Sequence, residues 1–241
     1  MSGHSKWKSI KHKKGKADAA RGAVFTKMAK LITVAAKNGG GDPTMNARLR
    51  LAVDKAKESN MPNDNIARAI KKGTGELEGV TYTEITYEAY APNAVGLLID
   101  VLTDNPNRTQ PELRNMIEKK GGSMASKGAV SFNFSEKGLF IFEPGVSEDK
   151  VMEVAIDAGA DDIQMQEDGS IEVSTAPADF ENVKKGLEAA GLKPANAEVT
   201  RVPGTTVDLQ GEASEKLQDI IDALEEHEDV QNVYHTGNFS E

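Results

Sequence analysis

The spacing of apolar residues changes near residue 80 of this 241-residue chain, from helices alone to a mixture of strands and helices, and that change limits the folds that the chain can adopt. Between residues 18 and 72, apolar side chains recur every three or four positions, which predicts amphipathic helices. From residue 85 onward, stretches in which apolar and polar residues alternate, and short apolar runs, predict strands, and further stretches with helical spacing lie between them. The sequence therefore predicts an α+β protein whose helical part comes first.

The first part reads as a three-helix domain. Val24, Met28, Leu31 and Ala35 share one face of a helix that begins near residue 18, with Lys30 on the polar face, and the glycines at 39–41 end it. We expect a second helix over residues 45–59 and a short third helix after Pro62. Glycines at 73, 75 and 79 indicate a linker.

Residues 138–202 follow a strand-helix-strand-strand-helix-strand order, which is the ferredoxin-like βαββαβ motif. The elements before this unit are incomplete: strands at 85–90 and 95–102, a helix with capping-box spacing from Thr109 to Glu112, and a strand at 129–134. A strand at 206–209, a helix at 212–227 and a strand at 230–234 complete them. We therefore predict three domains: residues 1–79, a discontinuous α+β domain of residues 80–134 plus 204–241, and an inserted ferredoxin-like domain of residues 135–203.

Charge is divided unevenly along the chain, whose net charge is −9. Residues 1–75 hold 17 lysines and arginines against 5 acidic residues, a balance of +12, and the remainder holds 12 against 33, a balance of −21. Such a division indicates an electrostatic partner for the basic part. Residues 3–16 alone contain six lysines, two histidines and the single tryptophan of the chain, without an acidic residue.

This basic part is the candidate nucleic-acid-binding site, with cations for the phosphate backbone and Trp7 for stacking on a base or packing on the first helix. Its predicted contact residues are Lys6, Trp7, Lys8, Lys11, His12, Lys13, Lys14, Lys16, Arg21, Lys27, Lys30, Arg48, Arg50, Arg68, Lys71 and Lys72. A possible second site lies between a central strand and a helix, where Asn105, Asn107 and Arg108 offer polar groups; turn and capping chemistry also explains these residues. Phe140 and Phe142 are assigned to core packing rather than to base stacking, because residues 138–202 have a balance of −9.

No catalytic residue, metal site or cofactor is predicted. The chain has no cysteine, its histidines lack a clear metal-binding spacing, and its glycines lack the context of a phosphate loop. No apolar run reaches the roughly 20 residues of a membrane span, and a cytoplasmic location is expected. The oligomeric state is left open, and the acidic domains are expected to engage protein partners or to fix geometry.

Many short motifs make the chain resemble the YebC-type family of bacterial regulatory proteins, which is related to mitochondrial translational activators. They include residues 3–7, 10–14, 21–22, 25–27, 40–43, 60–62, 64–66, 68–73, 82–90, 103–105, 107–109 and 121–122. The resemblance implies a helical domain and two α+β domains, and a cytoplasmic, non-enzymatic regulator of gene expression. One departure is Ala91-Pro92-Asn93-Ala94, where the family has a glycine-rich turn.

The resemblance leaves two functions open. The first is a DNA-binding transcriptional regulator. The alternative is a ribosome-associated translation factor that binds ribosomal RNA and eases elongation at stalling sequences such as proline runs. Lysine contacts to phosphate are alike on both nucleic acids, so the sequence does not choose between them.

Overall fold

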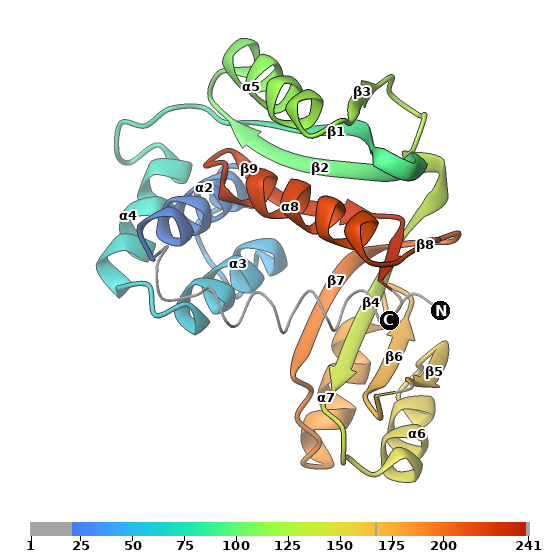
Figure 1. Cartoon of the computed structure of the whole chain (residues 1–241). Coiled ribbons are helices and arrows are strands. Elements are labelled where there is room, and N and C mark those ends of the chain that lie inside the picture. Colours follow the sequence, from blue (N-terminus) through green and yellow to red (C-terminus); the bar gives the residue numbers. More distant parts are fainter. Residues whose placement is uncertain (1–20, 167, 240–241) are drawn as a thin grey trace. The chain divides into compact units, whose positions relative to one another are not determined.

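The structure, a computed structural model, describes residues 21–166 and 168–239 (Figure 1). It has the predicted α+β fold, with three helices ahead of the sheets. Residues 21–129 and 211–235 belong to one compact unit, and residues 130–210 with 236–239 belong to a second. The three domain boundaries drawn from the sequence stay a prediction.

The first unit begins with the three helices: α2 (Arg21–Gly39), α3 (Ala47–Glu58) and α4 (Asn63–Thr74). Their apolar faces form one core, which includes Met28, Ile32, Leu49, Val53 and Ile66. Asn46 caps α3 by accepting a hydrogen bond from the backbone N–H of Leu49. Gly40, at φ +86°, lies just beyond the end of α2, as the glycine run predicted.

The sheet of this unit has the order β3-β1-β2-β9, with every neighbouring pair antiparallel. Its strands and helices are β1 (Thr83–Ala91), β2 (Val95–Thr103), α5 (Pro106–Lys119), β3 (Ser123–Ala125), α8 (Glu212–Glu226) and β9 (Val230–His235). The short 3-10 helix η1 (Pro92–Ala94) joins β1 to β2. Because β9 follows the intervening segment in sequence, the sheet is discontinuous, as predicted.

The second unit contains a sheet of order β5-β6-β4-β7, which is the ferredoxin-like arrangement. Its elements are η2 (Ser131–Asn133), β4 (Phe134–Phe142), α6 (Glu148–Asp157), β5 (Asp162–Met165), β6 (Ile171–Thr175), α7 (Phe180–Ala189) and β7 (Asn196–Pro203). Phe140 and Phe142 are fully buried, and the Phe140 ring stacks on Phe180 with centroids 4.8 Å apart. They are therefore core residues, as predicted.

Three predicted elements differ from the structure. Residues 129–133 form a turn and η2 rather than a strand, because Asn133 bonds both the N–H and the carbonyl of Thr205 through its side chain, and the strand β4 begins only at Phe134. The strand β8 (Val207–Leu209) does not join the first sheet; it pairs in parallel with β10 (Gly237–Phe239). The cap of α5 is Asn105, four residues before the predicted Thr109.

Candidate nucleic-acid interface

The helix α4, which carries three of the predicted contact residues, is fixed closely against α2. A Cβ on Gly73 would lie 2.4 Å from the carbonyl oxygen of Thr33, so this position requires glycine. The hydroxyl of Thr33 donates a hydrogen bond to the carbonyl of Ala69 at 3.2 Å. These contacts bring the two backbones together and determine which face of α4 remains accessible.

Arg68, Lys71 and Lys72 lie on the accessible part of α4, and all three side chains are exposed. Within residues 21–166 and 168–239, none of them forms a salt bridge. Lys71 and Lys72 occupy the last turn of the helix, where the helix dipole favours positive charge. The sequence thus places uncompensated cations where an anionic ligand can reach them.

A pocket of about 280 Å³ opens between α2 and α4. Its described lining consists of Phe25, Thr26, Ala29, Thr33, Met61, Asn65, Arg68, Ala69, Lys72 and Tyr82. Two of the three exposed cations of α4 therefore stand at this pocket. Arg50, another predicted contact residue, is exposed on α3 and donates a long hydrogen bond of 3.4 Å to the carbonyl of Pro43.

Other predicted cations have partners inside the protein. Arg48 binds Glu84 through both guanidinium nitrogens, at 3.0 and 2.7 Å. The ammonium of Lys27 donates a hydrogen bond to the carbonyl of Glu225. Both side chains hold the helical part against the α+β part of the same compact unit.

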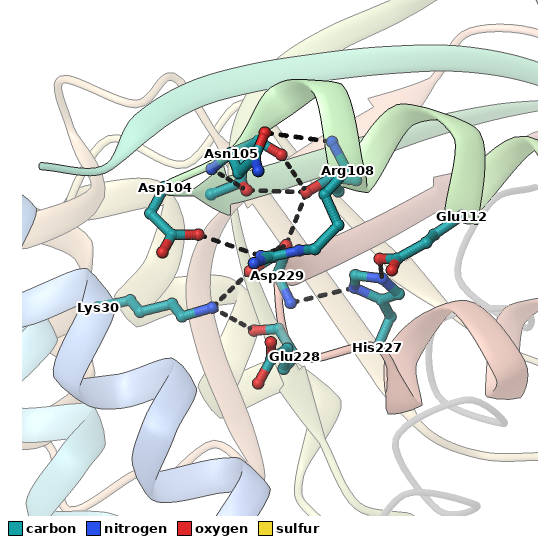
Figure 2. A network of polar contacts seen from close by, with 10 residues as sticks. Lys30, Asp104, Asn105, Arg108, Glu112, His227, Glu228 and Asp229 are labelled. Atoms are coloured by element: carbon teal, nitrogen blue, oxygen red, sulfur yellow. Dashed lines mark hydrogen bonds and ion pairs between the residues drawn. The ribbon is translucent and has the colours of Figure 1, made fainter. Parts of the chain in front are cut away.

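Lys30 differs most from its predicted setting, because it is only 6% exposed rather than on a polar surface. Its ammonium lies 2.6 Å from Asp229 Oδ1 and 3.1 Å from the carbonyl oxygen of Glu228 (Figure 2). It also lies 5.7 Å from the centre of the Tyr82 ring. The placement of Lys30 on the polar face was therefore wrong, and its charge is compensated within the fold.

Asp229 is the centre of the polar network in Figure 2. Its carboxylate is fully buried and accepts hydrogen bonds from Lys30, from Arg108 at 2.8 Å and from Thr109 at 2.7 Å. Burial alone would raise the pKa of Asp229, but these three donors outweigh it and hold the pKa far below its usual value. The carboxylate is therefore ionised at neutral pH, and it joins α2, α5 and the loop before β9.

His227 extends the network toward α5. Its Nδ1 accepts a hydrogen bond from the backbone N–H of Asp229 at 3.1 Å, and its Nε2 lies 3.0 Å from a carboxylate oxygen of Glu112. Because Nδ1 is an acceptor, the ring proton is on Nε2 and is donated to Glu112. His227 thus positions the loop that carries Asp229.

The possible second site takes part in this network rather than forming a separate cleft. Asn105 caps α5 through the N–H of Arg108, and the Arg108 guanidinium binds Asp229 and Asp104. The hydrogen bond to Asp229 raises the pKa of Arg108. Asn107 is exposed in the first turn of α5. A binding role for these three residues stays a prediction, and two of them already stabilise the fold.

Eight predicted contact residues lie outside the described residues: Lys6, Trp7, Lys8, Lys11, His12, Lys13, Lys14 and Lys16. Arg21 is the first residue of α2. The sequence interpretation missed Asp229 and Glu84, because nothing local distinguishes these acids from their neighbours. Searches of the described part of the chain found no group of three metal-binding side chains and no helix long and apolar enough to cross a membrane.

Comparison with known proteins confirms the resemblance seen in the sequence. Residues 5–76 match the family described as the TACO1/YebC protein N-terminal domain, and residues 82–237 match the TACO1/YebC second and third domain. A probable transcriptional regulatory protein of Paracidovorax citrulli is 53% identical over 98% of this chain and 99% of its own. One from Thiobacillus denitrificans is 54% identical over 97% of each chain.

The fold has a relative among solved structures. The crystal structure of a conserved hypothetical protein from Aquifex aeolicus matches with a TM-score of 0.83 and 41% sequence identity, over 94% of each chain. This match supports the α+β arrangement of helices followed by sheets.

Proposed function

Because this chain belongs to the TACO1/YebC family, we propose that it is a non-enzymatic regulator of gene expression that binds the phosphate backbone of a nucleic acid. One observation carries the proposal: Arg68, Lys71 and Lys72 stand exposed and without a described salt bridge on one helix of a chain whose net charge is −9. In an acidic protein, such a basic surface selects an anionic partner, and phosphate groups are the anions that nucleic acids offer in series.

The lysines at positions 6–16 add to this surface in the proposal. They immediately precede α2 in sequence, and residues 1–75 together have a balance of +12. Lys30 is not among the phosphate contacts that we propose, because Asp229 compensates its charge. The acidic remainder of the chain repels nucleic acid, so it confines binding to the basic part.

The family names favour DNA as the working target, since the curated relatives are called probable transcriptional regulatory proteins. Ribosomal RNA is the second candidate, and the pocket beside Arg68 and Lys72 favours it, because unpaired bases are accessible in RNA loops. Both targets use the same phosphate contacts, so experiments on binding must separate them.

The test compares the full chain with a chain that lacks residues 1–16, using a mobility-shift assay on duplex DNA and co-sedimentation with ribosomes. With about eight phosphate contacts, the logarithm of the affinity for duplex DNA should fall with the logarithm of salt concentration at a slope near −7. Deleting six lysines should reduce both the affinity and this slope. Ribosome association lost with the deletion favours translation, and a tight, sequence-specific DNA shift favours transcription.

A matched control replaces Lys184 and Lys185 of α7 with alanine, which removes basic charge from the acidic second unit. This variant should bind both nucleic acids as the full chain does. Binding that does not depend on salt, or that survives deletion of residues 1–16 with an unchanged slope, contradicts the proposal.

A further inference from the structure

We propose that the pocket between α2 and α4 holds one unstacked nucleotide of a single-stranded nucleic acid, with the base on its apolar floor and a phosphate at Arg68 and Lys72. This inference rests on the proposed function and adds to it a preference for single strands. The described lining of the pocket belongs to one compact unit of the protein.

The floor of the pocket is suited to the face of a base. Met61 and Ala69 are buried, so they close the pocket beneath its opening. Phe25 and Ala29 are half-buried in the wall formed by α2, and Phe25 supplies an aromatic ring. Bases of single strands bind by stacking on aromatic side chains and on apolar surface, and this mode tolerates different sequences.

The cations at the rim are arranged for a single anion. Arg68 and Lys72 are four residues apart on α4, so they occupy the same face one turn apart and repel each other. A phosphate between them relieves that repulsion. The chain after α4 passes along the Lys72 stem, since a Cβ on Gly79 would lie 3.3 Å from Lys72 Cβ, and this contact restricts where the ammonium can reach.

Uncharged polar groups complete the lining. Asn65 is half-buried at the pocket and its amide both donates and accepts hydrogen bonds, which suits the edge of a base. Tyr82 also lines the pocket, and the ammonium of the buried Lys30 lies 5.7 Å from the centre of its ring. Because Lys30 is held by Asp229, Tyr82 is linked to the polar network of Asp229.

The size of the pocket limits its ligand. Its volume of about 280 Å³ is near the lower end of the roughly 300–1,000 Å³ found for small-molecule sites. It therefore suits one nucleotide rather than a stacked pair. Bases within a duplex are stacked and paired, and they enter such a pocket only if they are flipped out at a cost in free energy. A depression along α5 lacks this character, because its described lining comes from that helix alone.

The test measures binding of three fluorescein-labelled probes by anisotropy at one fixed salt concentration: an octanucleotide RNA, the single-stranded DNA of the same sequence, and the corresponding DNA duplex. The variant Ala29→Leu places a larger apolar side chain in the pocket without changing charge. Its matched control is Ala47→Leu, the same substitution at an exposed position of α3. Thermal unfolding checks that both variants are folded.

We expect Ala29→Leu to weaken binding of the single strands by about tenfold or more, which is the scale of losing one stacked base, and to change duplex binding less than about twofold. Ala47→Leu should change neither. If the affinity for RNA and for single-stranded DNA falls equally, the pocket recognises the base and the phosphate. If the affinity for RNA falls more, the pocket also recognises the ribose hydroxyl. Either result supports the inference.

Single-strand binding that is unchanged in Ala29→Leu overturns the inference while leaving the proposed function intact. If the unmodified protein binds none of the three probes, the proposed function itself fails. Asn65→Ala gives a second, independent test should Ala29→Leu not fold. It leaves the charge unchanged and should weaken single-strand binding several-fold without affecting the duplex; equal binding by this variant also counts against the pocket.

Discussion

Two pairs of basic residues in one compact unit have opposite surroundings. One pair is Arg68 and Lys72 on α4, and the other is Lys30 and Arg108 at Asp229. The first pair is exposed and has no described salt bridge, whereas Lys30 and Arg108 share one buried carboxylate. The difference lies in whether the fold supplies an acidic partner for the cation. Substitutions should therefore separate stability from binding.

The largest effect on stability is expected from Asp229→Ala. Removing this carboxylate leaves Lys30 buried without a counterion, which should lower the free energy of unfolding by about 3–5 kcal/mol. Urea denaturation measures the change. Glu228→Ala, one residue away and exposed, is the control and should change stability by less than about 0.5 kcal/mol. A loss below about 1 kcal/mol in Asp229→Ala would mean that the network does not stabilise the unit.

The pH dependence of stability is the next largest effect. Because the native pKa of Asp229 is depressed, its contribution is fully present above the unfolded pKa of about 3.9 and is lost as pH falls toward the native pKa. Between pH 5 and pH 2, the unmodified protein should lose roughly 2 kcal/mol more than Asp229→Asn, which does not titrate there. Urea unfolding at a series of pH values tests this, and parallel curves for the two proteins would refute it.

A smaller effect is expected from the exposed pair of Arg48 and Glu84, whose side chains are 49% and 45% exposed. Solvent and salt weaken such a pair, so its coupling energy should be about 0.2–1 kcal/mol although the Arg48 guanidinium binds the carboxylate in a bidentate manner. A double-mutant cycle with Arg48→Ala and Glu84→Ala measures the coupling. A value that equals the effect at Asp229 would remove the distinction between the buried and exposed pairs.

The smallest effect on stability belongs to the cations of α4. Replacing Arg68, Lys71 and Lys72 together with alanine should change the free energy of unfolding by less than about 0.5 kcal/mol, since these side chains are exposed and alanine favours helices. Binding should respond instead. The slope of log affinity for duplex DNA against log salt concentration should become shallower by about 2.7, from roughly 0.9 for each of three phosphate contacts. An unchanged slope would exclude α4 from the interface.

Local patterns in the sequence predicted much of the fold. The spacing of Val24, Met28, Leu31 and Ala35 reflects the core that the helices share, and the order of strands and helices after residue 134 is visible in the periodicity. The prediction of a strand over residues 129–134 was wrong. Phe132 there is 82% exposed, and the Asn133 side chain donates a hydrogen bond to the carbonyl of Thr205. The cap of α5 was misplaced because both Asn105 and Thr109 are suitable capping residues.

The site was less predictable because its neighbours are distant in sequence. Lys30 and Asp229 are separated by 199 positions, and the short pattern around Lys30 is that of an exposed helix face. Arg68 and Lys72 show the converse, because their basic character alone indicated a role, whereas their position at a pocket depends on the close contact of Gly73 with α2. Charge is a local property, but its compensation depends on the tertiary structure.

The strands of the first unit's sheet are far apart in sequence, and this affects how the sheet folds while the chain is being synthesised on the ribosome. β2 pairs with β1 on one side and with β9 on the other, and Asp229 immediately precedes β9, so β9 and Asp229 emerge only after the whole of residues 130–210 has been translated. Until then β2 has an unpaired edge and Lys30 has no counterion, while the four-stranded sheet formed by β4–β7 can already fold. The nascent chain therefore carries an open sheet edge while residues 104–229 are translated, an interval in which chaperones can recognise it.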